Sequence, residues 1–296
     1  MLWYTVGRNE DFSAYGTRYG QTVNATNSAY ARYAPYYSVK ISNDTVRKDL
    51  DTPLSGIYVA FDVVFESIGY SSPIPIFYLL TADFKTNLLY LSMTDTTNNI
   101  FSVYVNGAVI GTFRILGIKA INRIEVHFVP DATAGIAQIW MNGELLVNYN
   151  GNTGNATQKI GSVRLESNAY AYNYFSNVVI SDNPIGNKIP IFLTMVDTAT
   201  VAAGVQLATP GTEYLADVVD LPTLPVVAKV TSVRITAQII AGDGVSNADW
   251  ELNVDGTTTA VTQSLPTTSA YKSAQIEGNW TPAQINGAKI GIKAEA

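Results

Sequence analysis

Two carboxylates lie on one face of a segment in which apolar and mixed residues alternate. Its apolar face consists of Ile57, Val59, Phe61, Val63 and Phe65. Asp62 and Glu66 lie on the opposite face of this predicted strand. Glycoside hydrolysis uses a pair of carboxylic acids roughly 5–9.5 Å apart. Four residues along a regular strand place two Cα atoms about 13 Å apart, so we expect solvated strand carboxylates rather than a catalytic pair.

The single histidine, His127, is the next residue that could do chemistry. Alternation within 122–129 places it beside Arg123 and Glu125 on the polar face of a predicted strand. A serine hydrolase would need a Gly-x-Ser-x-Gly turn, which the sequence lacks. One histidine and no cysteine also exclude a zinc site built on several such residues. We therefore predict an exposed strand histidine and no catalytic residue.

Three oxygen-rich loops are the candidates for a bound cation. They are residues 95–99, 182–183 and 243–249, which are rich in Asp and Asn. The third loop lacks the spacing and the final Glu of an EF-hand. Asp and Asn in β-loops mostly hydrogen-bond within their own turn. We predict turns and no cofactor, with calcium as the metal that the sequence leaves open.

Clustered tyrosines are the strongest candidates for a binding surface. Tyr170, Tyr172 and Tyr174 alternate along one segment, and Tyr36 and Tyr37 are neighbours near the start. A tyrosine ring is large and rigid and carries a hydroxyl, which suits both sugar stacking and protein interfaces. We predict that these five residues bind a ligand or pack against another subunit, and aromatic enrichment at interfaces favours subunit packing.

These side chains must be positioned by strands. Asn106-Gly107, Asn142-Gly143 and Asp255-Gly256 each stand between alternating apolar residues. Two-residue hairpin turns need positive φ at both central residues, which these dipeptides tolerate best. At least ten strands of five to nine residues are predicted before residue 182, and no long amphipathic helix accompanies them. The fold class is therefore all-β and antiparallel.

Length and composition suggest two domains and exclude several classes of protein. The chain has 296 residues, and a turn-rich stretch at 182–190 precedes a region poorer in aromatic residues. We predict domains at 1–188 and 195–296, the second with one helical turn from Thr281 to Gly287. The net charge of -6 argues against nucleic-acid binding. No signal peptide or 20-residue apolar span is evident, so we expect a protein made in the cytoplasm without a membrane anchor.

The late strands of the first predicted domain resemble those of concanavalin A-like, laminin-G-type jelly rolls. A strand at 122–128 precedes the hairpin Trp140-Met141-Asn142-Gly143-Glu144-Leu145-Leu146-Val147, and a last strand ends in Val178-Val179-Ile180-Ser181-Asp182. The resemblance covers 57–183 and implies a jelly-roll sandwich, a fold that hosts lectins, glycosidases and adhesion modules alike. Glycosidases of this fold carry a strand motif of the kind E-x-D-x-x-E, and Ala60 stands where its first Glu would be.

The end of the chain resembles small β domains of bacteriophage virion proteins. The resemblance rests on 280–293, which begins Trp280-Thr281-Pro282 and ends Ile290-Gly291-Ile292-Lys293. In those proteins such a domain often accompanies a laminin-G-type jelly roll. The resemblance therefore implies a smaller antiparallel β-sandwich that mediates assembly. The low share of charged residues, 14%, agrees with a chain whose surface is partly covered by neighbours.

Together these observations predict a non-enzymatic bacteriophage structural protein located in the virion. A tail fibre, a tail-tip adhesin and a capsid fibre or decoration protein remain open. The expected partners are other virion proteins, further copies of the chain in a homo-oligomer such as a trimer, and a glycan on the host surface. The alternatives are a jelly-roll glycoside hydrolase and a free carbohydrate-binding lectin.

Overall fold

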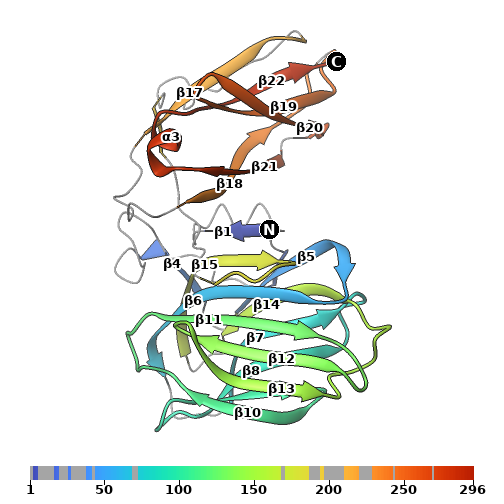
Figure 1. The fold of residues 1–296 in the computed structure, drawn as a ribbon, viewed down its shortest axis with the longest axis vertical. Helices are drawn as coiled ribbons and strands as arrows, with labels where there is room; N and C mark the ends of the chain where they lie inside the picture. Colours follow the sequence, from blue (N-terminus) through green and yellow to red (C-terminus); the bar gives the residue numbers. More distant parts are fainter. Residues whose placement is uncertain are drawn as a thin grey trace. The chain divides into compact units, whose positions relative to one another are not determined.

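The chain forms two compact units, Met1–Ile191 and Phe192–Ala296, whereas the predicted domain ranges were 1–188 and 195–296. The computed structural model describes residues 3–5, 17–19, 26–27, 38–41, 44–68, 73–167, 171–186, 194–196, 210–219, 229–242, 244–268 and 270–296. Antiparallel strands make up most of the described residues of both units, which confirms the predicted all-β fold class (Figure 1). Within the described ranges, no helix is long and apolar enough to span a bilayer.

The first unit is a jelly-roll sandwich of two antiparallel sheets. One sheet, here called the tyrosine sheet, has the order β10-β9-β8-β7-β14-β5-β2. Its strands are β2 (Thr17–Tyr19), β5 (Asp44–Leu54), β7 (Ile74–Thr81), β8 (Asn87–Asp95), β9 (Ile100–Val105), β10 (Ala108–Arg114) and β14 (Ile160–Ser167).

The other sheet carries His127 and is called the histidine sheet. Its order is β13-β12-β11-β6-β15-β4-β3, and β1 also pairs with β15. Its strands are β1 (Trp3–Thr5), β3 (Thr26–Asn27), β4 (Ser38–Ile41), β6 (Ile57–Ile68), β11 (Asn122–Val129), β12 (Gly135–Met141), β13 (Glu144–Gly151) and β15 (Ala171–Ser181).

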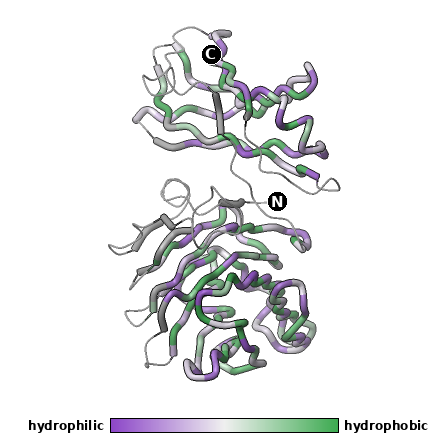
Figure 2. The backbone as a smooth tube through the Cα atoms, turned by 90° about the vertical axis from the view of Figure 1, so that its left-hand side faces the viewer, coloured by the Kyte–Doolittle hydropathy of each residue, from purple (hydrophilic) through white to green (hydrophobic). Residues whose placement is uncertain are grey.

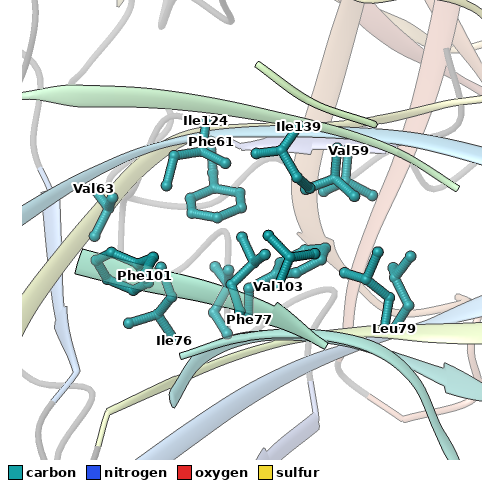
Figure 3. Packing of buried hydrophobic residues seen from close by; sticks show 14 of the residues in the cluster. Val59, Phe61, Val63, Ile76, Phe77, Leu79, Phe101, Val103, Ile124 and Ile139 are labelled. Atoms are coloured by element: carbon teal, nitrogen blue, oxygen red, sulfur yellow. The ribbon is translucent and has the colours of Figure 1, made fainter. Parts of the chain in front are cut away.

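The core of the first unit lies between these two sheets (Figure 3). The apolar face predicted for β6 is confirmed, because Ile57, Val59, Phe61, Val63 and Phe65 are all fully buried. Phe61 meets Phe77 from the tyrosine sheet, with ring centroids 5.2 Å apart. Burying one such side chain contributes about 1.5–3 kcal/mol. Hydrophobic and hydrophilic residues alternate along many of the strands (Figure 2), so each sheet keeps an outer face for polar contacts.

The three predicted hairpin turns are confirmed. Asn106, Asn142 and Asp255 have φ values of 50°, 52° and 51°, and the glycine after each has a φ of 80–88°. Positive φ at both central residues defines a type I′ turn, whose twist matches that of the flanking strands. These turns connect β9 to β10, β12 to β13, and β19 to β20.

The second unit packs a five-stranded sheet against a two-stranded one. The larger sheet has the order β16-β17-β22-β19-β20, and the smaller one pairs β18 with β21. The strands are β16 (Thr194–Val196), β17 (Glu213–Val219), β18 (Val230–Ile239), β19 (Asn247–Val254), β20 (Thr257–Ser264), β21 (Ala270–Trp280) and β22 (Lys289–Glu295). The predicted helical turn is α3 (Pro282–Asn286), capped by Thr281 in a capping box with Gln284.

The sequence predicts core positions for Trp140 and Trp250, and only the second prediction is right. Trp250 is fully buried among the residues that both sheets of the second unit contribute. Trp140 is half-buried on β12, opposite Glu125 of β11. Its neighbours in sequence, Ile139 and Met141, take the inward positions, so the two-residue period of the strand puts Trp140 on the outer face.

A carboxyl pair on the outer face of the five-stranded sheet makes the second unit sensitive to pH. Glu251 on β19 is only 6% exposed. Burial first, and then the hydrogen bond and charge of Glu213, raise the pKa of Glu251 to about 7, although Lys293 opposes the rise and Asp249 adds to it. The folded state therefore holds this proton more tightly than the unfolded chain, whose carboxyl has the ordinary pKa of 4.5.

The stabilisation from this proton is complete below pH 4.5 and is lost as the pH rises through about 7. We expect the second unit to lose about 1–2 kcal/mol across this window, since solvent screens part of the effect. Glu251→Gln should remove the loss, as measured by urea unfolding at pH 5 and pH 8. Glu277→Gln, at an exposed glutamate on β21, is the control. Equal pH dependence in wild type and Glu251→Gln would contradict the assignment.

Candidate binding face of the first unit

Three tyrosines lie side by side on the outer face of the tyrosine sheet. Tyr104 of β9 is directly opposite Tyr90 of β8, and Tyr90 is opposite Tyr78 of β7. The rings of Tyr90 and Tyr104 are nearly parallel, with centroids 4.3 Å apart, and those of Tyr78 and Tyr90 are 5.4 Å apart. Such separations are within the range at which aromatic rings attract each other. We call these three residues the tyrosine row.

Two arginines extend the tyrosine row toward β5. Arg164 of β14 is opposite Tyr78, and its guanidinium carbon lies 3.9 Å from the centroid of that ring. Arg47 of β5 is opposite Arg164, and its guanidinium lies 4.3 Å from the ring centroid of Phe84. Each cation is therefore held over an aromatic face, an arrangement worth about 0.5–2 kcal/mol.

A carboxylate on the same strand fixes each arginine further. Arg47 contacts Asp49 through two nitrogens, Nε to Oδ1 at 2.6 Å and Nη2 to Oδ2 at 3.1 Å. Arg164 makes one contact with Glu166, Nε to Oε2 at 3.2 Å. A guanidinium held by both a ring and a carboxylate loses little freedom when it binds a further acceptor. The site is therefore arranged before any ligand arrives.

Burial shapes the protonation of the groups around Arg164. It raises the pKa of the Tyr78 hydroxyl, with a smaller contribution from Glu166 and an opposing one from Arg164. Burial also raises the pKa of Tyr90, with help from Tyr104. The pKa of Glu166 is raised by burial and lowered in part by Arg164. Tyr78 and Tyr90 therefore stay neutral at physiological pH and can donate hydrogen bonds.

Small hydroxyl side chains flank the row on the same face of the sheet. Ser92 and Ser162 lie two residues from Tyr90 and Arg164 on the same strands, so they share their face. Both hydroxyl oxygens are buried, and in the described part of the chain neither has a hydrogen-bond partner. A buried hydroxyl without a partner costs about 1–3 kcal/mol, so these two hydroxyls lower the stability of this face.

The tyrosines predicted as binding residues are not the ones in the tyrosine row. Tyr174 is only 4% exposed, and its hydroxyl donates to Glu66 Oε2 at 2.9 Å. It therefore has no free ring face for a sugar. Tyr36, Tyr37 and Tyr170 lie outside the described residues, as does the side chain of Tyr172. A role for these four in binding or packing stays a prediction.

The prediction of a solvated Asp62 is wrong. Asp62 is 1% exposed and accepts hydrogen bonds from Arg123 Nη1 at 3.5 Å and from Asn177 Nδ2 at 2.7 Å. Arg123 also donates to the carbonyl of Asn177 at 2.7 Å. The buried carboxylate therefore has protein partners instead of solvent. Glu66, the other candidate acid, is half-buried and binds Tyr174.

His127 lies on the outer face of the histidine sheet, as its alternation predicts, but it is half-buried rather than exposed. Its ring stacks on Tyr58, with centroids 4.0 Å apart, and Nδ1 lies 3.0 Å from Gln138 Oε1. Glu125, two residues earlier, accepts the backbone N–H groups of Ile185 and Gly186. Part of the predicted linker is therefore attached to the first unit, where Ile185 packs against Ala60 and Val179.

Turn geometry explains the first of the three oxygen-rich loops. Asp95 accepts hydrogen bonds from the backbone of Thr97 and Asn98 and from the side chain of Asn98, and these bonds lower its pKa. Across the described ranges, no group of three or more His, Asp or Glu side chains is placed to hold a metal ion. Asp243 of the third loop lies outside those ranges, and calcium binding stays untested.

Comparisons with known proteins find structural likeness but no match in sequence. No family model and no curated protein matches the sequence. Among solved structures, the cellulose induced protein Cip1 has 15% identity to this chain and a TM-score of 0.43. The match covers 58% of this chain and 88% of the Cip1 chain. Alginate lyase A1-II′, of polysaccharide lyase family 7, has 11% identity and a TM-score of 0.42, covering 55% and 84%. Lectin I-B4 from Griffonia simplicifolia has 8% identity and a TM-score of 0.35, covering 49% and 87%.

These likenesses concern the fold alone, because one fold hosts many functions. They nevertheless contradict the prediction that the protein is not an enzyme, since alginate lyases are among the structures that it resembles. That prediction is withdrawn. The predicted virion role gains no support from the comparisons.

Proposed function

We propose that the first unit binds an extended acidic polysaccharide along the tyrosine row and its two arginines. The observation that carries this proposal is the unbroken series of contacts from Tyr104 through Tyr90 and Tyr78 to Arg164. Sugar hydroxyls accept hydrogen bonds from neutral phenols, and sugar rings pack against aromatic groups. Both kinds of contact are available along this row.

The shape of the row favours a chain over a single sugar. It crosses β9, β8, β7, β14 and β5 at directly opposed positions. Neighbouring strands are about 4.8 Å apart, so the row spans about 19 Å. A linear polysaccharide lying across the strands would contact several side chains at once. Because these contacts are made by one linked chain, together they bind it more tightly than any single contact would.

The charges at the β5 end favour an acidic ligand. Arg47 and Arg164 are directly opposite each other on neighbouring strands, and like charges in such positions repel. Asp49, which pairs with Arg47, and Glu166, which pairs with Arg164, offset part of that repulsion. A carboxylate or sulfate on the ligand would offset more of it, because a guanidinium binds such groups through two parallel hydrogen bonds.

Two finer readings stay open within this proposal. A glycan-active enzyme would cleave the bound chain, whereas a lectin or adhesin would only hold it. A virion protein that attaches to a host-surface glycan would use the same face, and this reading rests on the sequence resemblance of 280–293 alone. Binding and depolymerisation must therefore be measured together.

The test is calorimetric titration with a polyuronate such as alginate and with a neutral glucan, alongside a viscosity assay for cleavage. We expect binding to the polyuronate and at least about 30-fold weaker binding for Tyr90→Ala, a loss of about 2 kcal/mol. Tyr58→Ala is the matched control, because Tyr58 is also half-buried and stacked, but on the histidine sheet. Equal losses in both variants, or no binding to any charged polysaccharide, would overturn the proposal.

A further inference from the structure

The outermost described strand of the five-stranded sheet has an edge that no other described strand pairs with. Among the described strands of this sheet, β20 pairs with β19 alone, through all eight of its residues. Its sequence is Thr-Thr-Thr-Ala-Val-Thr-Gln-Ser, without a charge or a proline. Exposed edges are normally blocked by charged residues, proline, bulges or a covering segment, because their free backbone groups can pair with another chain.

The first half of β20 also extends beyond the core. Thr257 and Thr259 are opposite Val254 and Leu252, which point inward and are buried. Both threonines are nevertheless exposed, as are Thr258 and Ala260 on the other face. This half of the strand is therefore open on both faces and along its edge.

The second half of β20 is occupied by a contact with the smaller sheet. Gln263 on β20 donates from Nε2 to the backbone carbonyl of Ser273 on β21 at 2.7 Å. This contact ties the second half of β20 to the smaller sheet. The open part of the edge is therefore confined to residues 257–260.

The edges of the tyrosine and histidine sheets at β10 and β13 are protected in a different way. There, a side chain added at Gly111 would lie 2.8 Å from Val147 Cγ1, so the two edge strands approach each other closely. Arg114 and Glu144 add charges at the ends of those strands. Residues 257–260 have neither protection, and this difference requires an explanation.

We propose that residues 257–260 form an interface between two copies of this chain, through antiparallel pairing of β20 with its symmetry mate about a two-fold axis at Thr259. A two-fold interface requires a surface that is complementary to itself. An uncharged strand meets this requirement, because no like charges come to face each other, and threonine pairs across strands are favourable. Pairing would join two five-stranded sheets into one continuous sheet. The proposal does not depend on the polysaccharide face of the first unit.

The test is the mass of the full chain by light scattering and sedimentation over a range of concentrations. We expect wild type to form a dimer, and Thr259→Lys to be monomeric because two lysines would face each other across the two-fold axis. Thr267→Lys adds the same charge at an exposed position just after β20 and should leave the dimer intact. A monomeric wild type, or a dimer that survives Thr259→Lys, would overturn the proposal.

Cross-linking gives a second measurement that does not depend on a loss of folding. The chain has no cysteine, so one cysteine placed at residue 257, 258, 259 or 260 is unique. Opposed residues of antiparallel strands have Cα atoms about 4.5–5.5 Å apart, which suits a disulfide. We expect oxidation to link two chains at residue 259, which faces its own copy across the two-fold axis, and Thr267→Cys to stay unlinked. No cross-link at any of the four would contradict the pairing.

Discussion

Replacing Asp62 by alanine should lower the free energy of unfolding of the first unit by about 3–5 kcal/mol. The carboxylate is buried and is the ion-pair partner of Arg123, which is itself 8% exposed. Removing Asp62 takes the carboxylate away from a covered guanidinium, which also donates to the carbonyl of Asn177. Removing one partner of a buried ion pair costs far more than the ion pair itself contributes. Urea unfolding followed by circular dichroism would measure the change.

The control for this variant is Asp51→Ala, since Asp51 is exposed on β5 of the same unit. Its effect should stay within about 0.5 kcal/mol. A double variant, Asp62→Ala with Arg123→Met, should recover part of the lost stability because both charges are removed together. If Asp62→Ala unfolds like wild type but loses an activity on polysaccharides, Asp62 would be a catalytic acid after all, and the structural role would be wrong.

Replacing Arg164 by glutamine should weaken binding of an acidic polysaccharide by about 2 kcal/mol or more, at least 30-fold. Arg164 lies between Tyr78 and Arg47 in the row and has only one contact with Glu166. It is therefore the guanidinium with most capacity left for a ligand. Arg164→Lys should give an intermediate loss, because lysine keeps the charge but not the planar pair of donors.

Three further comparisons separate this effect from a general change of charge. Lys119→Gln removes one exposed cation from a loop of the same unit and should leave affinity nearly unchanged. Added salt should weaken wild-type binding more than binding by Arg164→Gln. Affinity for a neutral glucan should change little in either variant. If Lys119→Gln and Arg164→Gln lose equal affinity, net charge rather than this residue would explain binding.

The fold was predictable because its signals are local. The three hairpin turns, the alternation of β6 and the cap of α3 each depend on a few consecutive residues. β5 was missed because its sequence, Asp-Thr-Val-Arg-Lys-Asp-Leu-Asp-Thr-Pro-Leu, is mostly polar and contains a proline. The turn at Asp255-Gly256 predicts that a strand begins after it, but the extent of β20 was not predicted, since its threonines are exposed on both faces.

The binding face was not predictable by the same reasoning. Tyr78, Tyr90 and Tyr104 are on three strands, and only the pairing register brings them together. Sequence analysis instead selected tyrosines that are close along the chain, such as Tyr174, which proved to be buried. One signal was present: each tyrosine of the row has apolar residues on both sides. That pattern is typical of an outward position on a buried strand.

The order of strands in the sandwich has a consequence for how the chain is made. β7 ends at Thr81, and its neighbour β14 begins only at Ile160, about 80 residues later. β6 likewise pairs with β15, which is synthesised much later because it begins at Ala171. At about 5–20 residues per second, translation leaves β7 without this partner for about 4–16 seconds. During this interval its apolar edge is exposed to neighbouring nascent chains, so slower synthesis or higher temperature should favour aggregation before the sandwich closes.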